Sequence, residues 1–241
     1  MFDFHCHLFN NEKIEWFALN HGLNPKTNRI VLNSKKDKHF VALGIHPLEV
    51  TKLGEDEIEN ELYFIEEKLK KGEIQAIGET GLDYFWIKEP KYKDFQRELF
   101  ERFIELAEEY KKPLVVHSRE AEEEIVAMIE TIDKVEVVLH SFNYRKEELV
   151  KKVLDSLDNA YFTVSFSYSK KFKNFIKKIP IEKILLESDY PYKKISKTLK
   201  DAEIFMKKTI EIISEVKGLE REEVEKILDK NSFSVLKLDF Y

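Results

Sequence analysis

The stretch from residue 114 to residue 140 reads LVVHSREAEEEIVAMIETIDKVEVVLH, and it is the part of the chain that decides the fold. It holds two short apolar runs, Leu114–His117 and Glu136–His140, on either side of an amphipathic segment, Ala121–Ile132. Unbroken apolar pairs within such runs are typical of strands that are covered on both faces. The stretch therefore predicts a strand, a helix and a second parallel strand, with a histidine at the end of each strand.

The same alternation extends along the rest of the chain. Apolar runs predict six further strands, at Met1–Phe4, Arg29–Leu32, Phe40–Ile45, Ile74–Gly78, Tyr161–Val164 and Ile184–Glu187. Helical patterns cover Asp56–Lys71, Pro90–Tyr110, Arg145–Ser156, Lys171–Ile179, Leu199–Lys217 and Glu220–Leu228. Eight strands alternating with helices, without an obvious linker, predict a (β/α)8 TIM barrel that forms a single domain over residues 1–241.

The segment from Leu8 to Val41 is too short for two complete strand–helix units. We predict a helix at Glu12–His21 and then a strand at Arg29–Leu32, with little or no helix after it, so the region after strand 1 is shortened. An open doubly wound sheet is the alternative architecture, but no glycine-rich phosphate loop follows the first strand. The C-terminal helix is expected to close or cover the barrel.

Composition restricts the environment in which the protein works. The 241 residues contain no apolar run of membrane-spanning length, and the chain begins with a strand pattern and no visible signal peptide. The single cysteine, Cys6, excludes an internal disulfide and is expected to be a small buried hydrophobic residue. These features predict a cytoplasmic protein without membrane association. They leave the oligomeric state open.

Charge is distributed unevenly along the chain. Residues 143–200 contain thirteen lysines and Arg145 against seven acidic residues, a formal charge of +7 in a chain whose net charge is −6. Such a segment would attract a polyanion to one face. The more ordinary interpretation is that these lysines occupy solvated helix faces.

Six side chains that bind metals well fall at the carboxyl ends of predicted strands, where the active sites of barrels form. His5 and His7 alternate on one side of the first strand, and the other four are Glu79, His117, His140 and Asp189. Each has an ordinary structural explanation alone, as a core histidine, a cap or a turn residue. Together they exceed the needs of one tetrahedral ion and predict a two-metal hydrolytic site.

Three further histidines are separate from this set. His46 also follows a strand and is expected to contact substrate or to support a ligand. His21 and His39 lie outside the predicted strand ends, so we expect them to be ordinary surface residues.

The motifs together are similar to those of the TatD family of metal-dependent hydrolases, the deoxyribonuclease-like branch of the amidohydrolase superfamily. The matching segments, spread from residue 4 to residue 192, are FHCHL (4–8), GIHP (44–47), AIGETGLDY (76–84), PLVVHSR (113–119), LHSF (139–142) and LESDYPY (186–192). The resemblance implies a barrel with a binuclear centre. It places His5, His7 and Asp189 around one ion, His117 and His140 around the other, and Glu79 between them.

The chain departs from the family pattern at three places. The Leu8–Val41 segment is unusually short, and His140 is followed by Ser-Phe-Asn-Tyr where relatives carry Cys-Phe-Ser-Gly. An Arg-Asn-Glu-Pro motif is not recognisable after Tyr192. These departures fall in loops that shape the substrate pocket, so the resemblance predicts metal binding more directly than substrate identity.

The resemblance implies a deoxyribonuclease that uses two divalent ions (Zn, Mn or Mg) to activate water against a phosphodiester. Its expected substrate is DNA, as single strands or chain ends. Asp189 and Glu79 are the predicted catalytic residues. Predicted substrate contacts are His46, Asp83, Tyr84 and Arg119, with Tyr84 or Tyr192 stacking on a base.

The same ligands activate water for attack on carbon as well as on phosphorus. An amidohydrolase or deacylase that acts on a small amide or ester is therefore the alternative function. A metal-dependent binding protein without activity is a third, less favoured interpretation, because the predicted ligand set lacks nothing.

Overall fold

The computed structural model describes residues 1–10, 12–34, 37–167, 169–191 and 196–240. Its strands form one sheet in which neighbours follow the order of the chain and every adjacent pair is parallel. The strands are β1 (Phe2–Cys6), β2 (Phe17–His21), β3 (His39–Leu43), β4 (Ala76–Asp83), β5 (Leu114–Arg119), β6 (Val137–His140), β7 (Ala160–Val164) and β8 (Ile184–Leu186).

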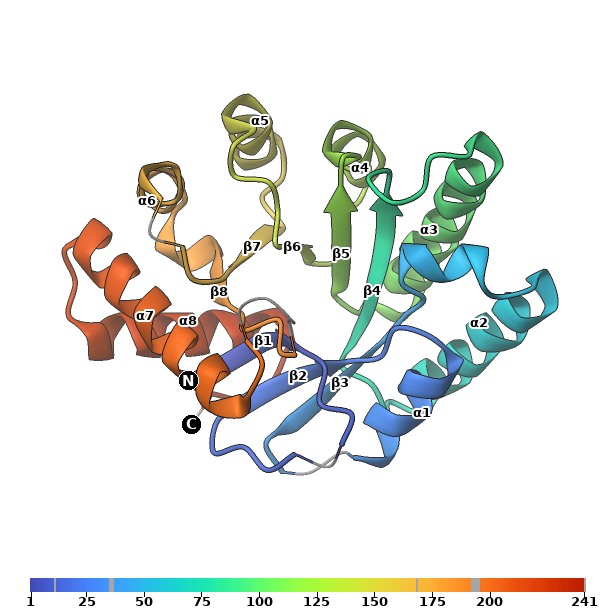
Figure 1. The fold of residues 1–241 in the computed structure, drawn as a ribbon, viewed down its shortest axis with the longest axis horizontal. Helices are drawn as coiled ribbons and strands as arrows, with labels where there is room; N and C mark the ends of the chain where they lie inside the picture. Colours follow the sequence, from blue (N-terminus) through green and yellow to red (C-terminus); the bar gives the residue numbers. More distant parts are fainter. Residues whose placement is uncertain (11, 35–36, 168, 192–195, 241) are drawn as a thin grey trace.

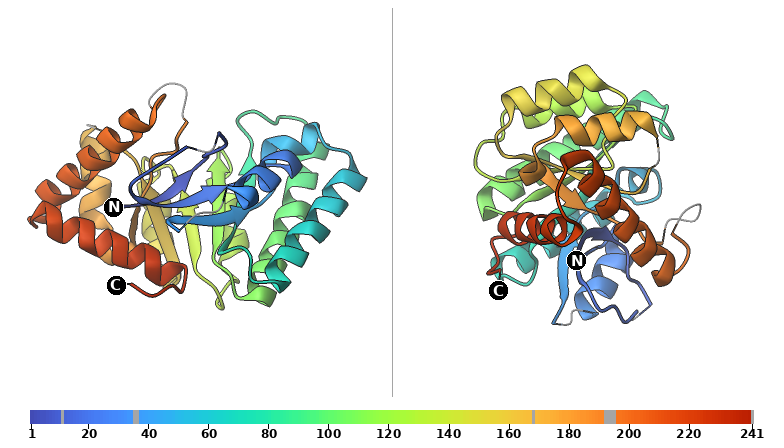
Figure 2. Two further views of the ribbon diagram at one scale, coloured as in Figure 1. Left: turned by 90° about the horizontal axis from the view of Figure 1, so that it is seen from below. Right: turned by 90° about the vertical axis from the view of Figure 1, so that its left-hand side faces the viewer.

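Helices surround the strands, as Figure 1 shows. The α-helices are α1 (Pro25–Asn33), α2 (Glu55–Lys70), α3 (Pro90–Tyr110), α4 (Glu122–Ile129), α5 (Glu147–Ser156), α6 (Lys170–Lys178), α7 (Leu199–Lys217) and α8 (Arg221–Val235). Two short 3-10 helices are η1 (Pro47–Thr51) and η2 (Ile181–Lys183). Figure 2 shows α7 and α8 on one side of the strands and α1 to α3 on the other. No helix of the described residues is long and apolar enough to cross a membrane.

The segment after β8 joins the first strand and brings the sheet close to a complete barrel. The backbone N–H of Asp189 donates to the carbonyl of His5 at 2.9 Å, and that of His7 donates to the carbonyl of Tyr190 at 2.6 Å. The predicted single TIM barrel is thus confirmed, and the open doubly wound alternative is wrong. Because of this junction, the carboxyl ends of β1 and β8 lie side by side.

Two predicted elements in the first forty residues are wrong. The predicted helix at Glu12–His21 is replaced by β2, and the predicted strand at Arg29–Leu32 lies inside α1. Helix α1 begins there because Asn24 and Thr27 form a capping box, in which each side chain accepts a hydrogen bond from the backbone N–H of the other, and Pro25 occupies the first turn. The described residues between β1 and β2 contain no helix, so the shortened connection after strand 1 is confirmed.

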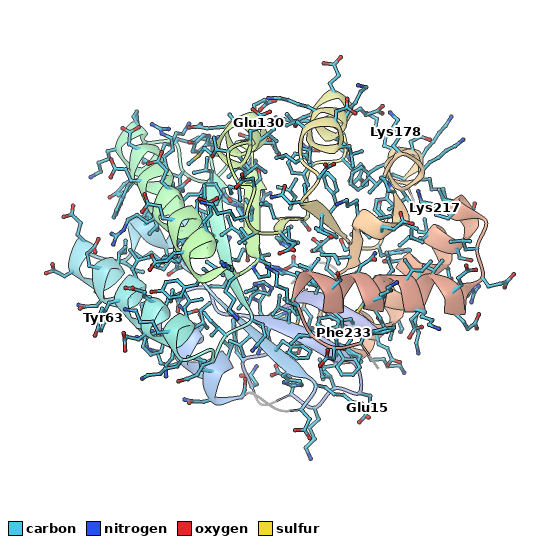
Figure 3. The ribbon with its side chains drawn as sticks, turned by 180° about the vertical axis from the view of Figure 1, so that it is seen from behind. Glu15, Tyr63, Glu130, Lys178, Lys217 and Phe233 are labelled. Carbon is cyan, nitrogen blue, oxygen red and sulfur yellow. The ribbon has the colours of Figure 1, made fainter. Side chains whose placement is uncertain are left out.

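The C-terminal helix covers the amino-terminal end of the barrel, as expected. The ring of Phe233 in α8 lies 5.3, 5.1 and 6.1 Å from the rings of Phe2, Phe17 and Phe40, which stand at the starts of β1, β2 and β3. The C-terminal helix is longer than predicted, because α8 continues through this aromatic contact. Figure 3 labels Phe233 on α8.

Glycine allows β4 to approach β5 closely. Gly81 has a φ of +137°, and a Cβ atom at this position would lie 2.1 Å from the carbonyl oxygen of His117. The register of the two strands shifts between Ile77 and Thr80. This close approach brings Glu79 on β4 beside His117 on β5.

Candidate metal centre

Glu79 lies at the centre of the site, and its two carboxylate oxygens face different groups of side chains. Its Oε2 atom lies 3.3 Å from His5 Nε2 and 3.8 Å from His7 Nε2. The His7 Nε2 atom lies in turn 3.6 Å from Asp189 Oδ1. These contacts gather the two histidines of the first strand segment and the aspartate that follows β8 on one side of Glu79.

The other oxygen of Glu79 faces three imidazoles. Its Oε1 atom lies 2.7 Å from His117 Nδ1, 3.7 Å from His46 Nε2 and 3.8 Å from His140 Nε2. His46 follows β3, His117 lies in the second half of β5, and His140 ends β6. The other five residues predicted as metal ligands thus lie around the Glu79 carboxylate near the carboxyl ends of the strands, and His46 joins them.

The donor set fits divalent cations. Within 4.8 Å of one another lie ligand atoms of three groups, namely His5–His140–Asp189, His5–His7–Glu79 and His46–Glu79–His117. His5 is fully buried, and its Nδ1 atom has no hydrogen-bond partner among the described residues. Burial holds the pKa of His5 well below its usual value, so its imidazole is neutral, as a metal ligand must be. Neutral imidazoles with carboxylates suit zinc, manganese and similar ions.

Glu187 orients His140. The Nδ1 atom of His140 lies 2.7 Å from Glu187 Oε2, and the hydroxyl of Ser141 donates to Glu187 Oε1 at 2.6 Å. Burial lowers the pKa of His140, but the carboxylates of Glu187 and Glu79 more than offset this effect and raise it to about 10. A carboxylate on the far nitrogen of a ligand histidine fixes the ring and increases its basicity. This role was not predicted from the sequence, although Glu187 lies two residues before Asp189.

Asp3 supports the segment that carries Asp189. The buried Asp3 carboxylate accepts hydrogen bonds from the backbone N–H of Ser188 at 2.9 Å and from its hydroxyl at 2.6 Å. Burial raises the pKa of Asp3 to about 7, against the partly compensating bonds from Ser188. Asp3 therefore positions the residue next to Asp189 from beneath the site.

The four predicted substrate contacts lie in different environments. His46 is at the metal centre, where its Nδ1 atom accepts the N–H of Leu48 at 3.2 Å and burial lowers its pKa to about 3. Asp83 is buried, and its Oδ2 atom lies 3.2 Å from His117 Nε2.

Tyr84 and Arg119 lie farther out. The Tyr84 hydroxyl accepts a hydrogen bond from Arg97 of α3 at 3.2 Å, so this side chain is engaged with a helix. The Arg119 guanidinium lies over the ring of Phe85, 4.3 Å from its centre. Tyr192 lies outside the described residues.

The expectation that His21 and His39 are surface residues is wrong, because both are buried. His21 ends β2, the strand that was predicted as a helix, and so it reaches the metal centre. Its ring stacks on that of His5 with 4.0 Å between centres, and its Nε2 atom donates to the carbonyl of Phe4 at 3.2 Å. Burial lowers the pKa of His21 to about 3, so it is a neutral support for His5. Cys6 is buried, as expected.

Five of the thirteen lysines in residues 143–200 form ion pairs with acids in the described part of the chain. Lys146 lies 2.9 Å from Glu122, Lys152 lies 2.6 Å from Glu130, and equally short pairs involve Lys151, Lys173 and Lys178. These pairs reduce the local positive charge around α5 and α6. The solvated helix face is therefore the better description of this segment.

A TIM barrel with imidazoles and carboxylates gathered at the carboxyl ends of its strands is typical of metal-dependent hydrolases. The chain matches the model of the TatD related DNase family over residues 2–237, and it belongs to this family. It is 32% identical over 203 residues to an uncharacterized metal-dependent hydrolase of Methanocaldococcus jannaschii, covering 84% of this chain and 78% of the relative.

Other relatives extend this likeness. The uncharacterized metal-dependent hydrolase YabD of Bacillus subtilis is 29% identical over 221 residues, covering 88% of this chain and 83% of YabD. A Mus musculus relative, named as a candidate deoxyribonuclease, is 28% identical over 221 residues, covering 85% of this chain and 72% of the relative. The crystal structure of the TatD homologue YjjV of Escherichia coli has the same fold, with a TM-score of 0.79, 19% identity and coverage of 99% and 98%.

Proposed function

We propose that the protein hydrolyses phosphodiester bonds in DNA, at single strands or chain ends, with two divalent cations held on either side of Glu79. The observation that carries the proposal is the division of neighbours between the two oxygens of this carboxylate. Oε2 faces His5 and His7, and Oε1 faces His117 and His140. Membership of a family described as TatD related DNases supports DNA as the substrate.

His5, His7 and Asp189 would hold one ion, His117 and His140 the other, and Glu79 would contact both. Bound there, divalent ions supply an activated water and positive charge opposite the phosphate oxygens. Four imidazoles favour zinc or manganese, and magnesium is the third candidate.

Two carboxylates of the chain have different roles. Asp189 accepts a proton, and Glu79 stays ionised between the two groups of histidines. Asp189 has 27% of its side chain exposed, against 4% for Glu79, so it is the carboxylate that an attacking water can reach. We assign to it the uptake of the proton released by this water. Burial raises the pKa of Glu79, but the surrounding imidazoles outweigh this effect and hold it well below its usual value. Glu79 therefore stays ionised and keeps the two groups of histidines together.

Two substitutions test these roles. Glu79→Ala and Asp189→Ala should each reduce turnover of single-stranded DNA by roughly 10²- to 10⁴-fold or more, because each removes a ligand and a catalytic carboxylate. Rates would be measured with labelled oligonucleotides and added Mn²⁺, Mg²⁺ or Zn²⁺, and circular dichroism would check the fold. Glu223→Ala, at an exposed acidic position on α8, is the matched control. Full activity of either site variant would contradict the mechanism.

A substrate panel separates the proposed function from its rival. Single-stranded DNA, duplex DNA, RNA and small amide and ester compounds would be offered with each metal and with a chelator. We expect cleavage of DNA that requires metal. Hydrolysis of an amide or ester without cleavage of DNA would replace the nuclease by the amidohydrolase alternative.

A further inference from the structure

Two neighbouring aromatic side chains are exposed on the loop that follows β4. Large hydrophobic side chains with high exposure in the described part of the chain are Tyr63 (65%), Phe85 (37%), Trp86 (60%), Ile204 (39%) and Phe240 (39%). Phe85 and Trp86 are adjacent, and they lie on the connection that follows the strand of Glu79. Two rings exposed to solvent do not gain the free energy that burial of an aromatic side chain provides. Neighbouring exposed apolar groups of this kind mark sites that bind a ligand or partner.

The loop that carries these rings is held in place from the metal centre. The buried Asp83 carboxylate accepts the backbone N–H of Trp86 at 2.9 Å through Oδ1, and its Oδ2 atom lies 3.2 Å from His117 Nε2. Ile87, the next residue, is buried, with 6% of it exposed. One carboxylate thus joins the exposed turn to a predicted metal ligand, and the turn is fixed at both ends.

Arg119 completes the surface from the neighbouring strand β5. Its guanidinium carbon lies 4.3 Å from the centre of the Phe85 ring and 5.6 Å from that of Trp86. Among the residues that the structure describes, no carboxylate lies within salt-bridge distance of Arg119, whereas the nearby Lys88 pairs with Glu120 at 3.2 Å. Arg119 is exposed, and a guanidinium stacked on an aromatic ring keeps its N–H donors free for a phosphate.

We infer that Phe85, Trp86 and Arg119 form a subsite for one unpaired nucleotide beside the metal centre, with the indole stacking on the base and the guanidinium binding its phosphate. This inference rests on the proposed function and specifies how the substrate is held. A base can lie flat on an exposed indole only when it is unstacked from its neighbours, so the subsite selects single strands and frayed ends. Of the two tyrosines expected to stack on a base, Tyr84 holds Arg97 through its hydroxyl, and Tyr192 lies outside the described residues.

Steady-state kinetics test the subsite. For the metal-loaded enzyme with a single-stranded oligothymidylate, Trp86→Ala should raise KM by roughly 5- to 100-fold, the range expected for loss of one base–aromatic contact, while kcat changes little. Trp86→Phe should retain most of the affinity, because it keeps an aromatic face. Tyr63→Ala removes an equally exposed ring from the periphery of α2 (Figure 3) and should leave KM unchanged.

A binding measurement tests the same subsite without turnover. The chain has two tryptophans, so Trp16→Phe leaves Trp86 as the sole indole. A phosphorothioate oligothymidylate should quench the fluorescence of this variant, and an oligomer of abasic sugar phosphates should not. Arg119→Gln should raise the concentration of the phosphorothioate oligomer needed for half-maximal quenching, because it removes a phosphate contact.

The outcomes distinguish the subsite from the proposed function. If the wild-type enzyme cleaves DNA and Trp86→Ala has an unchanged KM, the subsite is wrong and the proposed function stands. If the wild-type enzyme cleaves no DNA, the proposed function fails, and quenching decides the subsite. Absence of quenching by the phosphorothioate oligomer, or equal quenching by the abasic one, would overturn the inference.

Discussion

Glu79 shows at the scale of one residue how the chain builds a charged centre inside a barrel. A buried carboxylate is costly unless opposite charge or hydrogen bonds compensate it. Here the compensation comes from imidazoles on four different strand ends, each within 3.8 Å of one carboxylate oxygen. The same arrangement directs the ring nitrogens of these imidazoles at one small volume, as metal binding requires.

The sequence pattern predicted the candidate metal ligands better than it predicted the residues around them. His5, His117 and His140 are recognisable in the sequence because each ends an apolar run. His21 is not, because its segment was predicted as a helix, so His21 was not placed at a strand end. Trp86 was missed for another reason: whether an aromatic ring is buried or exposed depends on the path of its loop, which no local pattern indicates.

Asp3 makes a pH-dependent contribution to stability. Its pKa is about 7 in the folded protein against an ordinary value of 3.8, because burial disfavours the charged form. Between about pH 4 and pH 7 the unfolded chain is ionised at Asp3 and the folded protein is not, so Asp3 lowers the free energy of unfolding as the pH rises through this range. An asparagine in its place cannot ionise, and it retains an acceptor for Ser188.

We therefore expect Asp3→Asn to gain stability relative to the native protein as the pH is raised, by up to about 4 kcal/mol between about pH 4 and pH 8. Urea denaturation at several pH values, with a chelator throughout, would measure the difference. Asp133→Asn at an exposed position controls for the substitution itself. A stability difference that stays constant with pH would contradict the assignment to Asp3.

At the scale of elements, the reliability of prediction followed the length and clarity of each pattern. Helix α3 was predicted with its observed bounds, because its apolar residues recur over 21 positions. The β2–α1 region was wrong because the apolar and polar residues of its strand (FALNH) and its helix (PKTNRIVLN) do not follow a clear strand or helix period. The apolar run at Arg29–Leu32 resembles a strand, and only the Asn24 cap shows that it lies within a helix.

Helix α1 accordingly depends on its cap. The Asn24 side chain accepts the N–H of Thr27 at 3.0 Å, and the Thr27 hydroxyl accepts the N–H of Asn24 at 3.0 Å. Asn24→Ala should lower the free energy of unfolding by about 1 kcal/mol. Chemical denaturation would measure this loss, with Lys26→Ala at the exposed second position of the helix as control. Equal stability of the two variants would show that α1 does not need the cap.

At the scale of the whole molecule, chemistry and stability occupy opposite ends of the barrel. The candidate ligands lie at the carboxyl ends of the strands, and the aromatic cluster of Phe2, Phe17, Phe40 and Phe233 lies at the amino ends. Such a division lets loops at one end change their chemistry without a change in the core. It accounts for a chain that keeps the family's ligand motifs while its loops depart from the family pattern.

The division leads to a prediction for Phe233. This residue is buried, with 6% of it exposed, and its ring packs edge-on against three rings of the barrel. Phe233→Ala should lower the free energy of unfolding by about 3–5 kcal/mol, because it removes a large buried side chain and leaves a cavity. At temperatures where the variant remains folded, kcat and KM should match those of the native enzyme, since the metal centre lies at the other end.

Thermal denaturation and steady-state rates on the same preparations would measure both quantities. Phe240→Ala, which removes a neighbouring ring that is 39% exposed, is the matched control and should cost less than about 1 kcal/mol. A folded Phe233→Ala enzyme with lowered kcat would show that α8 transmits strain through the strands to Glu79. Packing at one end of the barrel would then affect catalysis at the other. Protein interiors are packed as densely as organic crystals, so a shift of atoms at one end of a strand can be transmitted to the other end.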